Sequence, residues 1–372
     1  MKILFIHNTL AEYRISFFHE LSCLVDLDIL ITEEKLASSI YNFTPLEEIF
    51  NTLNIIKLSK VKNIESIIEN GTYDIVVLPP IDNFYQIRCA HCALLACRTK
   101  GIKTVFWTEK WEALKELQPL TKRIKNYIQA QFISFFANKC DLCIVSGTKS
   151  KNYLRSKGIV ESKINVAIDS STSVPYKGKI DIREKYNIPK DGKIILYLGR
   201  LVKRKGCEIL IDAFGKLSND NLLYLVICGE GNEEITLRNY IKKYKINNVI
   251  FTGKVDPKIR SAYFKQSNLF VLPSYTYKGV IEAWGLTVNE SLEQGTPVVV
   301  TTAVGAGYDL SDNKCCIMVN ENDRNALMEG IKKIMSNGDM TAKCRKRYSL
   351  FNVEGMAKSF YNVFKKLNTK RE

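Results

Sequence analysis

The sequence predicts an α/β protein of two doubly wound domains, each built on a parallel β-sheet covered by helices. Short apolar runs that are typical of buried strands alternate with amphipathic helical stretches along the whole chain. The chain has 372 residues, and it contains more such runs than one open sheet usually holds. Together these observations indicate two sheets and two hydrophobic cores.

The expected strands follow one another in chain order, with helical patterns in the gaps. In the first half they are KILFIHN, LDILIT, YDIVVLP, KTVFWT, LCIVSG and INVAID. In the second half they are KIILYLG, LYLVICG, VIFTG, LFVLPS, TPVVVT and CCIMV. The pair Asp26-x-Asp28 falls in the strand pattern VDLDILIT, so we interpret it as structural rather than as a metal-binding motif.

A polar stretch at residues 171–193 marks the boundary between the two domains. It holds two prolines and two glycines, and a new strand follows it. We therefore expect an N-terminal domain at 1–180 and a C-terminal domain at 181–355. A final helix at 356–372 is expected to pack back toward the N-terminal domain.

The formal net charge of +15 indicates an anionic partner, which is a nucleic acid, an acidic membrane surface or a phosphorylated ligand. Residues 101–180 carry fourteen Lys and Arg against six Asp and Glu. The sequence has no helix-turn-helix or RNP-like motif, which argues against nucleic acid. No apolar run approaches the ~18–20 residues that span a bilayer. The start MKILFIHN is interpreted as a buried strand and not as a secretory signal, so we expect a cytoplasmic protein.

The segment 122–139, KRIKNYIQAQFISFFANK, predicts a helix with a basic start. Its apolar residues recur at helical spacing, at Ile124, Tyr127, Ile128, Phe132, Phe135 and Phe136. This pattern favours a helix that packs on a sheet. The excess of positive charge leaves a second interpretation open, in which a basic amphipathic helix touches an anionic membrane.

Two groups of cysteines imitate the spacing of a zinc site. Cys89, Cys92 and Cys97 form one group, and Cys140 and Cys143 form the other. They stand in apolar helix and strand patterns, where cysteine acts as a small hydrophobe. We therefore expect no metal.

The motif GRLVKRKG at 199–206 joins a strand to a helix through a glycine turn. Free N–H groups at a helix start favour phosphate, and Arg200, Lys203, Arg204 and Lys205 add positive charge. The alternative is a solvated basic loop. The place of the motif after a strand favours ligand binding, since open α/β sheets bind ligands there.

Two glutamates, Glu282 and Glu290, flank a second glycine turn at Gly285. Thr287 and Glu290 fit the capping-box pattern, so Glu290 has a structural role available. Glu282 is either a loop charge or a ligand contact. A helix that starts beside Gly285 directs free N–H groups toward an anion, and carboxylates beside it suit hydroxyl groups. Phosphate with hydroxyls suggests a nucleotide sugar.

These motifs resemble the C-terminal half of the retaining glycosyltransferases of family 4, also called glycosyl transferases group 1. The shared pattern is the Gly-Arg…Lys-Gly turn, followed by Glu-x7-Glu and Gly-x-Pro-Val in EAWGLTVNESLEQGTPVVV. The resemblance covers about residues 190–360, and the first half only by its α/β rhythm. It implies a GT-B fold, with two Rossmann-like domains facing a central cleft, and sugar transfer with retention and without metal or cofactor.

The resemblance also implies roles for single residues. Arg200 and Lys205 would hold the donor diphosphate and Glu282 would contact the donor sugar, so these three are the expected catalytic residues. Glu290 would bind the ribose. The full set of expected donor-binding residues is Gly199, Gly229, Glu230, Gly231, Lys254, Val255, Trp284, Gly285, Leu286, Thr287 and Glu290.

The N-terminal half departs from many relatives, which have a Gly-Gly turn after the first strand. Here Arg14 follows Tyr13 at that place, and it either supplies a positive group or is a surface residue at a helix start. Glu109 in WTEKW stands where relatives have a histidine, so it is a candidate contact for the acceptor or sugar.

The expected enzyme takes a nucleotide-sugar donor and a cell-envelope glycan or lipid-linked acceptor. The basic N-terminal half suits an anionic membrane surface, so a peripheral position on the inner face of the cell membrane is open. Two alternatives remain. One is another GT-B enzyme, such as a sugar-nucleotide epimerase, and the other is a basic nucleic-acid-binding protein.

Overall fold

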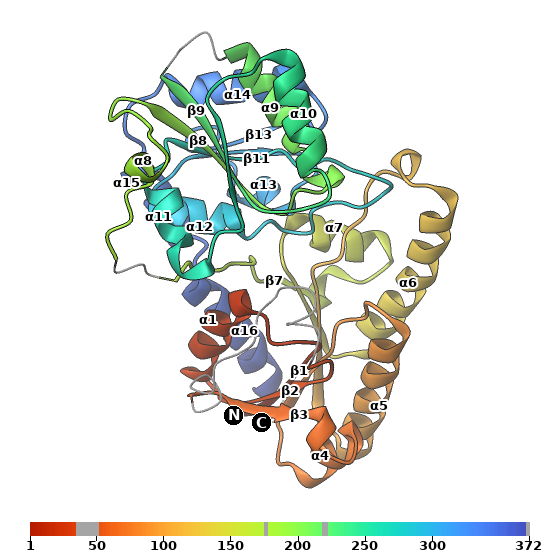
Figure 1. Ribbon diagram of the computed structural model, residues 1–372. Helices are drawn as coiled ribbons and strands as arrows, with labels where there is room; N and C mark the ends of the chain where they lie inside the picture. Colours follow the sequence, from red (N-terminus) through yellow and green to blue (C-terminus); the bar gives the residue numbers. More distant parts are fainter. Residues whose placement is uncertain (35–51, 175–177, 218–221, 370–372) are drawn as a thin grey trace. The chain divides into compact units, whose positions relative to one another are not determined.

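The computed structural model describes residues 1–34, 52–174, 178–217 and 222–369, and the chain forms two compact units (Figure 1). Unit 1 comprises Met1–Trp111, Leu120–Ser170 and Val353–Glu372, and unit 2 comprises Glu112–Pro119 and Ser171–Asn352. Apart from the short segment Glu112–Pro119, unit 2 thus starts at Ser171, whereas the expected boundary was at 180/181. Residues 175–177 of the expected boundary stretch lie outside the described residues.

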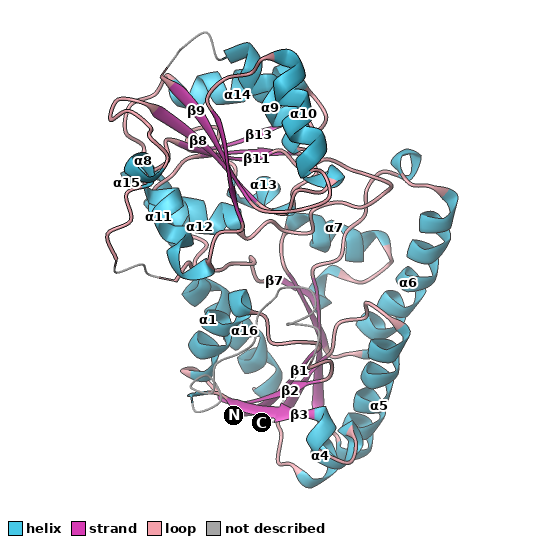
Figure 2. Cartoon of the chain, viewed as in Figure 1, coloured by secondary structure: helices cyan, strands magenta, loops and turns pink. Residues whose placement is uncertain are grey.

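Unit 1 has, within the described residues, a seven-stranded parallel sheet in the order β3-β2-β1-β4-β5-β6-β7 (Figure 2). Its strands are β1 (Lys2–His7), β2 (Asp26–Ile31), β3 (Asn54–Lys57), β4 (Ile75–Leu78), β5 (Lys103–Thr108), β6 (Leu142–Val145) and β7 (Ile164–Val166). Its helices are α1 (Glu12–Ser22), α4 (Ile64–Asn70), α5 (Phe84–Lys100), α6 (Leu120–Lys139), α7 (Thr148–Ser156) and α16 (Val353–Asn368). Strand β3 was not predicted, because it lies at the edge of the sheet, where its residues are half-buried or exposed and do not form a long apolar run.

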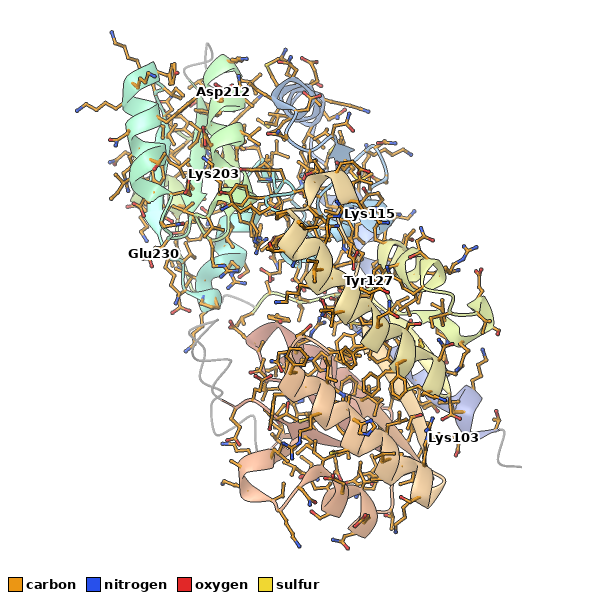
Figure 3. The ribbon with its side chains drawn as sticks, turned by 90° about the vertical axis from the view of Figure 1, so that its right-hand side faces the viewer. Lys103, Lys115, Tyr127, Lys203, Asp212 and Glu230 are labelled. Atoms are coloured by element: carbon orange, nitrogen blue, oxygen red, sulfur yellow. The ribbon has the colours of Figure 1, made fainter. Side chains whose placement is uncertain are left out.

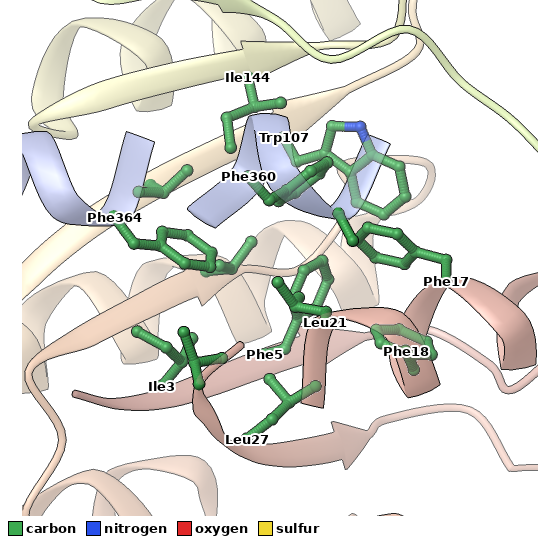
Figure 4. Close-up of a cluster of buried hydrophobic side chains, with 14 of the residues drawn as sticks. Ile3, Phe5, Phe17, Phe18, Leu21, Leu27, Trp107, Ile144, Phe360 and Phe364 are labelled. Atoms are coloured by element: carbon green, nitrogen blue, oxygen red, sulfur yellow. The ribbon is translucent and has the colours of Figure 1, made fainter. Parts of the chain in front are cut away.

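Helix α16 brings the far end of the chain into the core of unit 1, where it packs against α1. Figure 4 shows Phe360 of this helix beside Phe17 and Trp107. The rings of Trp107 and Phe360 meet edge to face, with centroids 5.4 Å apart, and those of Phe5 and Phe18 meet likewise at 5.2 Å. Such pairs add stability beyond the burial of their apolar area.

Unit 2 has, in its described part, a six-stranded parallel sheet in the order β10-β9-β8-β11-β12-β13. Its strands are β8 (Lys193–Leu198), β9 (Leu223–Cys228), β10 (Val249–Gly253), β11 (Leu269–Leu272), β12 (Val298–Thr301) and β13 (Cys316–Val319). Its helices are α8 (Ile182–Lys185), α9 (Cys207–Leu217), α10 (Glu234–Tyr244), α11 (Arg260–Lys265), α12 (Thr287–Gln294), α13 (Gly305–Leu310), α14 (Arg324–Met335) and α15 (Thr341–Ser349). The predicted α/β class is confirmed in both units.

The structure shows the surroundings of Asp28 and of the two cysteine groups. Asp28 is buried, and its carboxylate accepts hydrogen bonds from Asn54 at 2.6 Å and from Tyr73 at 2.7 Å. Of the predicted zinc-like groups, Cys89, Cys97, Cys140 and Cys143 are buried. The described residues contain no group of three or more His, Cys, Asp or Glu side chains placed to hold a metal ion. None of the described helices combines the length and apolar character needed to cross a bilayer.

Candidate active site

The loops that follow the strands of unit 2 bring most predicted donor residues to one edge of its sheet. Gly199–Gly206 follows β8 and Gly229–Gly231 follows β9. The two loops are joined by a backbone hydrogen bond of 2.8 Å, in which the N–H of Leu201 donates to the carbonyl of Glu230. This carboxyl edge is where open α/β sheets bind ligands.

Two glycines allow the loop after β8 to lie close to its neighbours, the loops after β9 and β11. Gly206 has a φ of +68°, and a Cβ atom there would lie 2.0 Å from the carbonyl oxygen of Pro273. Gly229 has a φ of +143°, and its Cβ would lie 1.9 Å from the carbonyl oxygen of Gly199. Both approaches are too close for any side chain, so the loop packing depends on glycine.

Glu282 is held at the same edge by backbone and side-chain contacts. Its N–H donates to the carbonyl of Ala303 at 3.0 Å, and its own carbonyl accepts from the N–H of Gly305 at 3.1 Å. Its Oε2 atom lies 2.6 Å from Nη1 of Arg204 and 2.6 Å from Nζ of Lys205. A carboxylate between two cations is therefore the centre of the candidate site.

Charge dominates the chemistry of this cluster. The exposed fraction is 17% for the side chain of Glu282, 12% for Lys205 and 21% for Arg204. Burial opposes ionisation of Glu282, but the two cations outweigh it and hold its pKa below the usual value. Burial lowers the pKa of Lys205, and the positive charges of Arg204 and Arg200 lower it further against the pull of Glu282. The excess of cations over carboxylates suits a phosphate ligand.

Arg204 is the member of this cluster that the predicted catalytic set left out. The sequence shows four cations within GRLVKRKG, but it does not show which of them point toward Glu282. A single 3₁₀ turn at Lys203–Lys205 decides this, because it directs Arg204 and Lys205 to the carboxylate. Arg200 is exposed, and Lys203 instead pairs with Glu208 at 3.0 Å.

The expected capping box at the start of α12 is wrong. The helix begins at Thr287 with Leu286 at the N-cap position, and no side chain caps it. Gly285 turns the chain at a φ of +100° and Leu286 already has helical dihedrals, so Thr287 lies inside the first turn. The buried carboxylate of Glu290 lies near Arg260, whose Nη1 is 3.3 and 3.2 Å from its two oxygens.

The remaining predicted donor residues lie in the surrounding loops. Glu230 and Lys254 are brought together, because the N–H of Lys254 donates to Oε1 of Glu230 at 3.3 Å. Val255 is half-buried beside them. Trp284 is buried, and its indole N–H donates to Asn289 at 3.0 Å. This bond links the loop that carries Glu282 to α12.

Unit 1 has a second polar cluster at the carboxyl edge of its own sheet. Arg14 is only 2% exposed, which rules out a surface residue at the helix start. Its Nη2 atom donates to Asp169 at 3.0 Å and also to Glu109. Its guanidinium lies 4.8 Å from the ring centre of Trp107. Sequence reasoning missed Asp169, which stands 155 residues from Arg14.

Burial sets the protonation of the groups around Arg14. Glu109 is only half-buried, yet this partial burial raises the pKa of its carboxyl, opposed by Arg14 and aided by the negative charge of Asp169. Burial and the charge of Arg14 lower the pKa of His7 to about 4. The imidazole of His7 is therefore neutral near pH 7, and its Nδ1–H donates to the carbonyl of Thr9 at 2.8 Å.

We predict that His7 makes the protein less stable as the pH falls. Its pKa is about 4 in the folded chain and 6.5 without perturbation, so the unfolded state binds more protons between these values. The stability that the protein has with a neutral His7 is fully present above pH 6.5 and is lost as the pH falls toward 4. Between about pH 7.5 and about pH 5, protonation of His7 in the unfolded state should lower the unfolding free energy by roughly 2 kcal/mol.

Urea unfolding at both pH values measures this loss, and His7→Gln should abolish the part of the loss that is due to His7. The exposed His91→Gln is the control and should keep the wild-type dependence. An unchanged dependence in His7→Gln would contradict the prediction.

Known proteins resemble this chain in both sequence and fold. The family described as Glycosyl transferases group 1 matches residues 178–349. An uncharacterized glycosyltransferase of Methanocaldococcus jannaschii is 26% identical over 243 residues, which is 61% of this chain and 60% of the relative. The O-antigen biosynthesis glycosyltransferase WclY of Escherichia coli is 29% identical over 175 residues, which is 47% of this chain and 46% of WclY. The chain thus spans about half the length of the curated relatives it matches.

The likeness in fold extends over nearly the whole chain. The crystal structure of Anabaena Alr3699/HepE in complex with UDP has a TM-score of 0.73 at 15% identity, and it covers 98% of this chain and 100% of that one. This match shows the fold, which is GT-B as predicted. The family match falls on the unit that holds Glu282, Arg204 and Lys205, so residues 178–349 of this chain are similar to the glycosyl transferases group 1 family.

Proposed function

We propose that this protein is a retaining, metal-independent glycosyltransferase. It moves a sugar from a nucleotide-sugar donor to a cell-envelope glycan or a lipid-linked acceptor. The observation that carries the proposal is the ion cluster of Glu282 with Arg204 and Lys205 at the carboxyl edge of the unit 2 sheet. The similarity to WclY, an O-antigen biosynthesis glycosyltransferase, supports an envelope glycan as the product.

The cluster suits the departure of a nucleoside diphosphate. When the bond between the anomeric carbon and the phosphate oxygen breaks, its electron pair stays on the diphosphate. Arg204 and Lys205, with the exposed Arg200 nearby, stabilise that charge without a metal ion. Glu282 accepts hydrogen bonds from the hydroxyls of the donor sugar. The acceptor hydroxyl then attacks the face that the leaving group has left and passes its proton to the departing phosphate oxygen, so the configuration at the anomeric carbon is retained.

The nucleoside lies along the neighbouring loops. Glu290 accepts hydrogen bonds from the ribose hydroxyls, and its contact with Arg260 fixes the direction of the carboxylate. The loops at Gly229–Gly231 and at Lys254 and Val255 bring backbone groups to the same edge.

We assign the acceptor side to unit 1, at the carboxyl edge of its sheet. Glu109 is the candidate contact there, because Arg14 donates to one of its oxygens while the side chain stays 36% exposed. Arg14 is a positioning residue, since it is buried and acts through Glu109. The protein is expected at the cytoplasmic face of the cell membrane, with no nucleic acid as a partner.

Lys205→Met is expected to weaken the affinity for nucleoside diphosphates by about 10- to 100-fold, because it removes a charged hydrogen-bond donor to phosphate. The measurement is a thermal-shift titration with UDP, GDP, ADP and TDP and with their sugar conjugates. A ligand at about 100 times its Kd should stabilise the wild type by about 2.7 kcal/mol.

Lys203→Met is the matched control, since Lys203 pairs with Glu208 and Glu233 and makes no ion pair with Glu282. Its affinity should change by less than about threefold. If no nucleotide or nucleotide sugar shifts the wild type, the donor assignment is wrong. If both lysine variants weaken binding equally, the cluster at Glu282 is not the phosphate site.

A further inference from the structure

Helix α6 places large apolar side chains in solvent instead of on the sheet. Leu120 and Tyr127 are each 68% exposed, Ile124 is 52% exposed, Ile128 44% and Phe135 41%. Figure 3 views this helix with Tyr127 labelled on it. The expected packing on a sheet through the apolar stripe is therefore wrong for most of its members. Of those members, only Phe136 is fully buried.

These exposed residues form one continuous stripe. At 3.6 residues per turn, Leu120, Ile124, Tyr127, Ile128 and Phe135 all fall within about 100° of one another around the helix axis. We call these five residues the outer stripe. The buried positions of α6 lie on the opposite side, at Asn126, Ala130, Ile133, Phe136 and Ala137.

The inner side of α6 explains why the apolar stripe can face outward. In its first half the helix is tied to unit 1 by polar contacts. The ammonium of Lys110 donates to Asn126 at 3.3 Å and to Gln129 at 3.1 Å. Gln129 in turn donates to the carbonyl of Ile81 at 2.8 Å. The fold of unit 1 thus holds this half of the helix without using the outer stripe.

Charge on α6 is of one sign only. The helix carries Lys122, Arg123, Lys125 and Lys139 and has no Asp or Glu. By the same helical geometry, Arg123 falls on one side of the outer stripe, and Lys125 and Lys139 fall on the other. Arg123, Lys125 and Lys139 are exposed. An apolar stripe flanked on both sides by cations is typical of helices that lie in a membrane interface.

We propose that α6 is a lipid-docking helix, which lies along an anionic bilayer surface and inserts the outer stripe between the headgroups. Arg123 and Lys125 contact the anionic headgroups, and Tyr127 lies at the boundary of acyl chains and water, where its hydroxyl stays hydrated. The inference deepens the proposed function, because it names the surface by which the enzyme meets a membrane that carries its acceptor.

The sign of the charge favours lipid over a second copy of this chain. Two copies of α6 facing each other would bring eight cations together with no carboxylate from either helix, as each helix contributes four. Like charges at that distance repel, whereas a leaflet that contains phosphatidylglycerol supplies the opposite charge.

The test is flotation with mixed vesicles of phosphatidylcholine and phosphatidylglycerol and with vesicles of phosphatidylcholine alone. We expect the wild type to bind the anionic vesicles at least about tenfold more tightly. The combined substitution Leu120→Ser, Ile124→Ser and Tyr127→Ser should lower that binding by at least about tenfold. Arg123→Gln with Lys125→Gln should lower it by about fivefold for each charge and reduce its salt dependence.

Ile235→Ser is the matched control, since Ile235 is 75% exposed but belongs to α10 in unit 2. This variant should bind vesicles like the wild type. The proposal is overturned if the triple variant binds as tightly as the wild type, or if the wild type binds no anionic vesicles. The proposal is also overturned, in favour of a second copy of the chain, if the wild type binds no vesicles but forms a dimer and the triple variant is a monomer.

Tyr127→Trp tests the position of the helix directly. The three native tryptophans, Trp107, Trp111 and Trp284, are buried, so a fluorophore on α6 reports separately in the difference spectrum. The emission of the tryptophan introduced in this variant should shift to shorter wavelength when anionic vesicles are added. If it does not shift, α6 is not the surface that contacts the lipid.

The triple variant should still show the thermal shift with nucleotide sugars. If vesicles bind but no nucleotide does, the proposed function fails and the lipid surface stands.

Discussion

Replacing Glu282 by alanine is expected to lower kcat/KM for sugar transfer by about 10²- to 10³-fold, or roughly 3–4 kcal/mol of transition-state free energy. The substitution removes the acceptor of hydrogen bonds for the donor sugar. It also leaves Arg204 and Lys205 without the carboxylate that both contact at 2.6 Å. Initial rates with the donor found by thermal shift measure the effect.

Two further measurements separate a sugar contact from a structural role. Glu282→Gln keeps one hydrogen-bond acceptor, so it should retain more activity than Glu282→Ala. Affinity for the nucleoside diphosphate alone should persist or rise in both variants, because the cations no longer share their charge with a carboxylate. Glu161→Gln is the matched control, since Glu161 also lies near two cations, Lys151 and Arg155, but on unit 1. Normal turnover in Glu282→Ala would remove this residue from the site.

The fold could be predicted because its signal is local and repeated. Each buried strand of these parallel sheets is an apolar run, and each run is followed by turn residues and a helical pattern. The glycine turns at Gly199–Gly206 and Gly285 were also visible, because glycine is the residue that such close approaches require. Strand β3 was missed because this edge strand has only two apolar residues, Ile55 and Ile56, between polar ones.

The pairings within the sites could not be predicted, because they depend on distant parts of the chain. Arg14 meets Asp169 across 155 positions, and Glu282 meets Arg204 across 78. Nothing in either local sequence names the partner. The packing of α6 was predicted wrongly for another reason. The spacing of its apolar residues correctly predicted a helix, but this spacing does not say which face of the helix packs against the rest of the domain. Polar anchors such as Asn126 decided that, and they appeared in the sequence as ordinary surface residues.

Asp169→Ala is expected to lower the unfolding free energy of unit 1 by about 3–5 kcal/mol, the largest stability effect we predict. Asp169 is 0% exposed, and it accepts hydrogen bonds from Arg14 and from the N–H of Ser170 at 2.9 Å. Without it, a guanidinium that is 2% exposed keeps, among the described residues, only Glu109 as an anionic partner. Burial disfavours the charged form of Arg14, and Asp169 is the main charge that raises its pKa against that effect.

A second substitution shows whether the unpaired charge causes the loss. The double variant Arg14→Met with Asp169→Ala removes both charges, so it should be at least about 2 kcal/mol more stable than the sum of the single losses predicts. Urea unfolding followed by tryptophan emission measures this, and a Trp284→Phe background confines the signal to Trp107 and Trp111 in unit 1. The exposed pair of Lys151 and Glu161 is the control, and its removal should cost less than about 1 kcal/mol. Additive losses at Arg14 and Asp169 would mean that each residue stabilises the fold by itself. In that case Asp169 would not stabilise the charge of Arg14, and the assignment of Arg14 as the residue that positions Glu109 would be wrong.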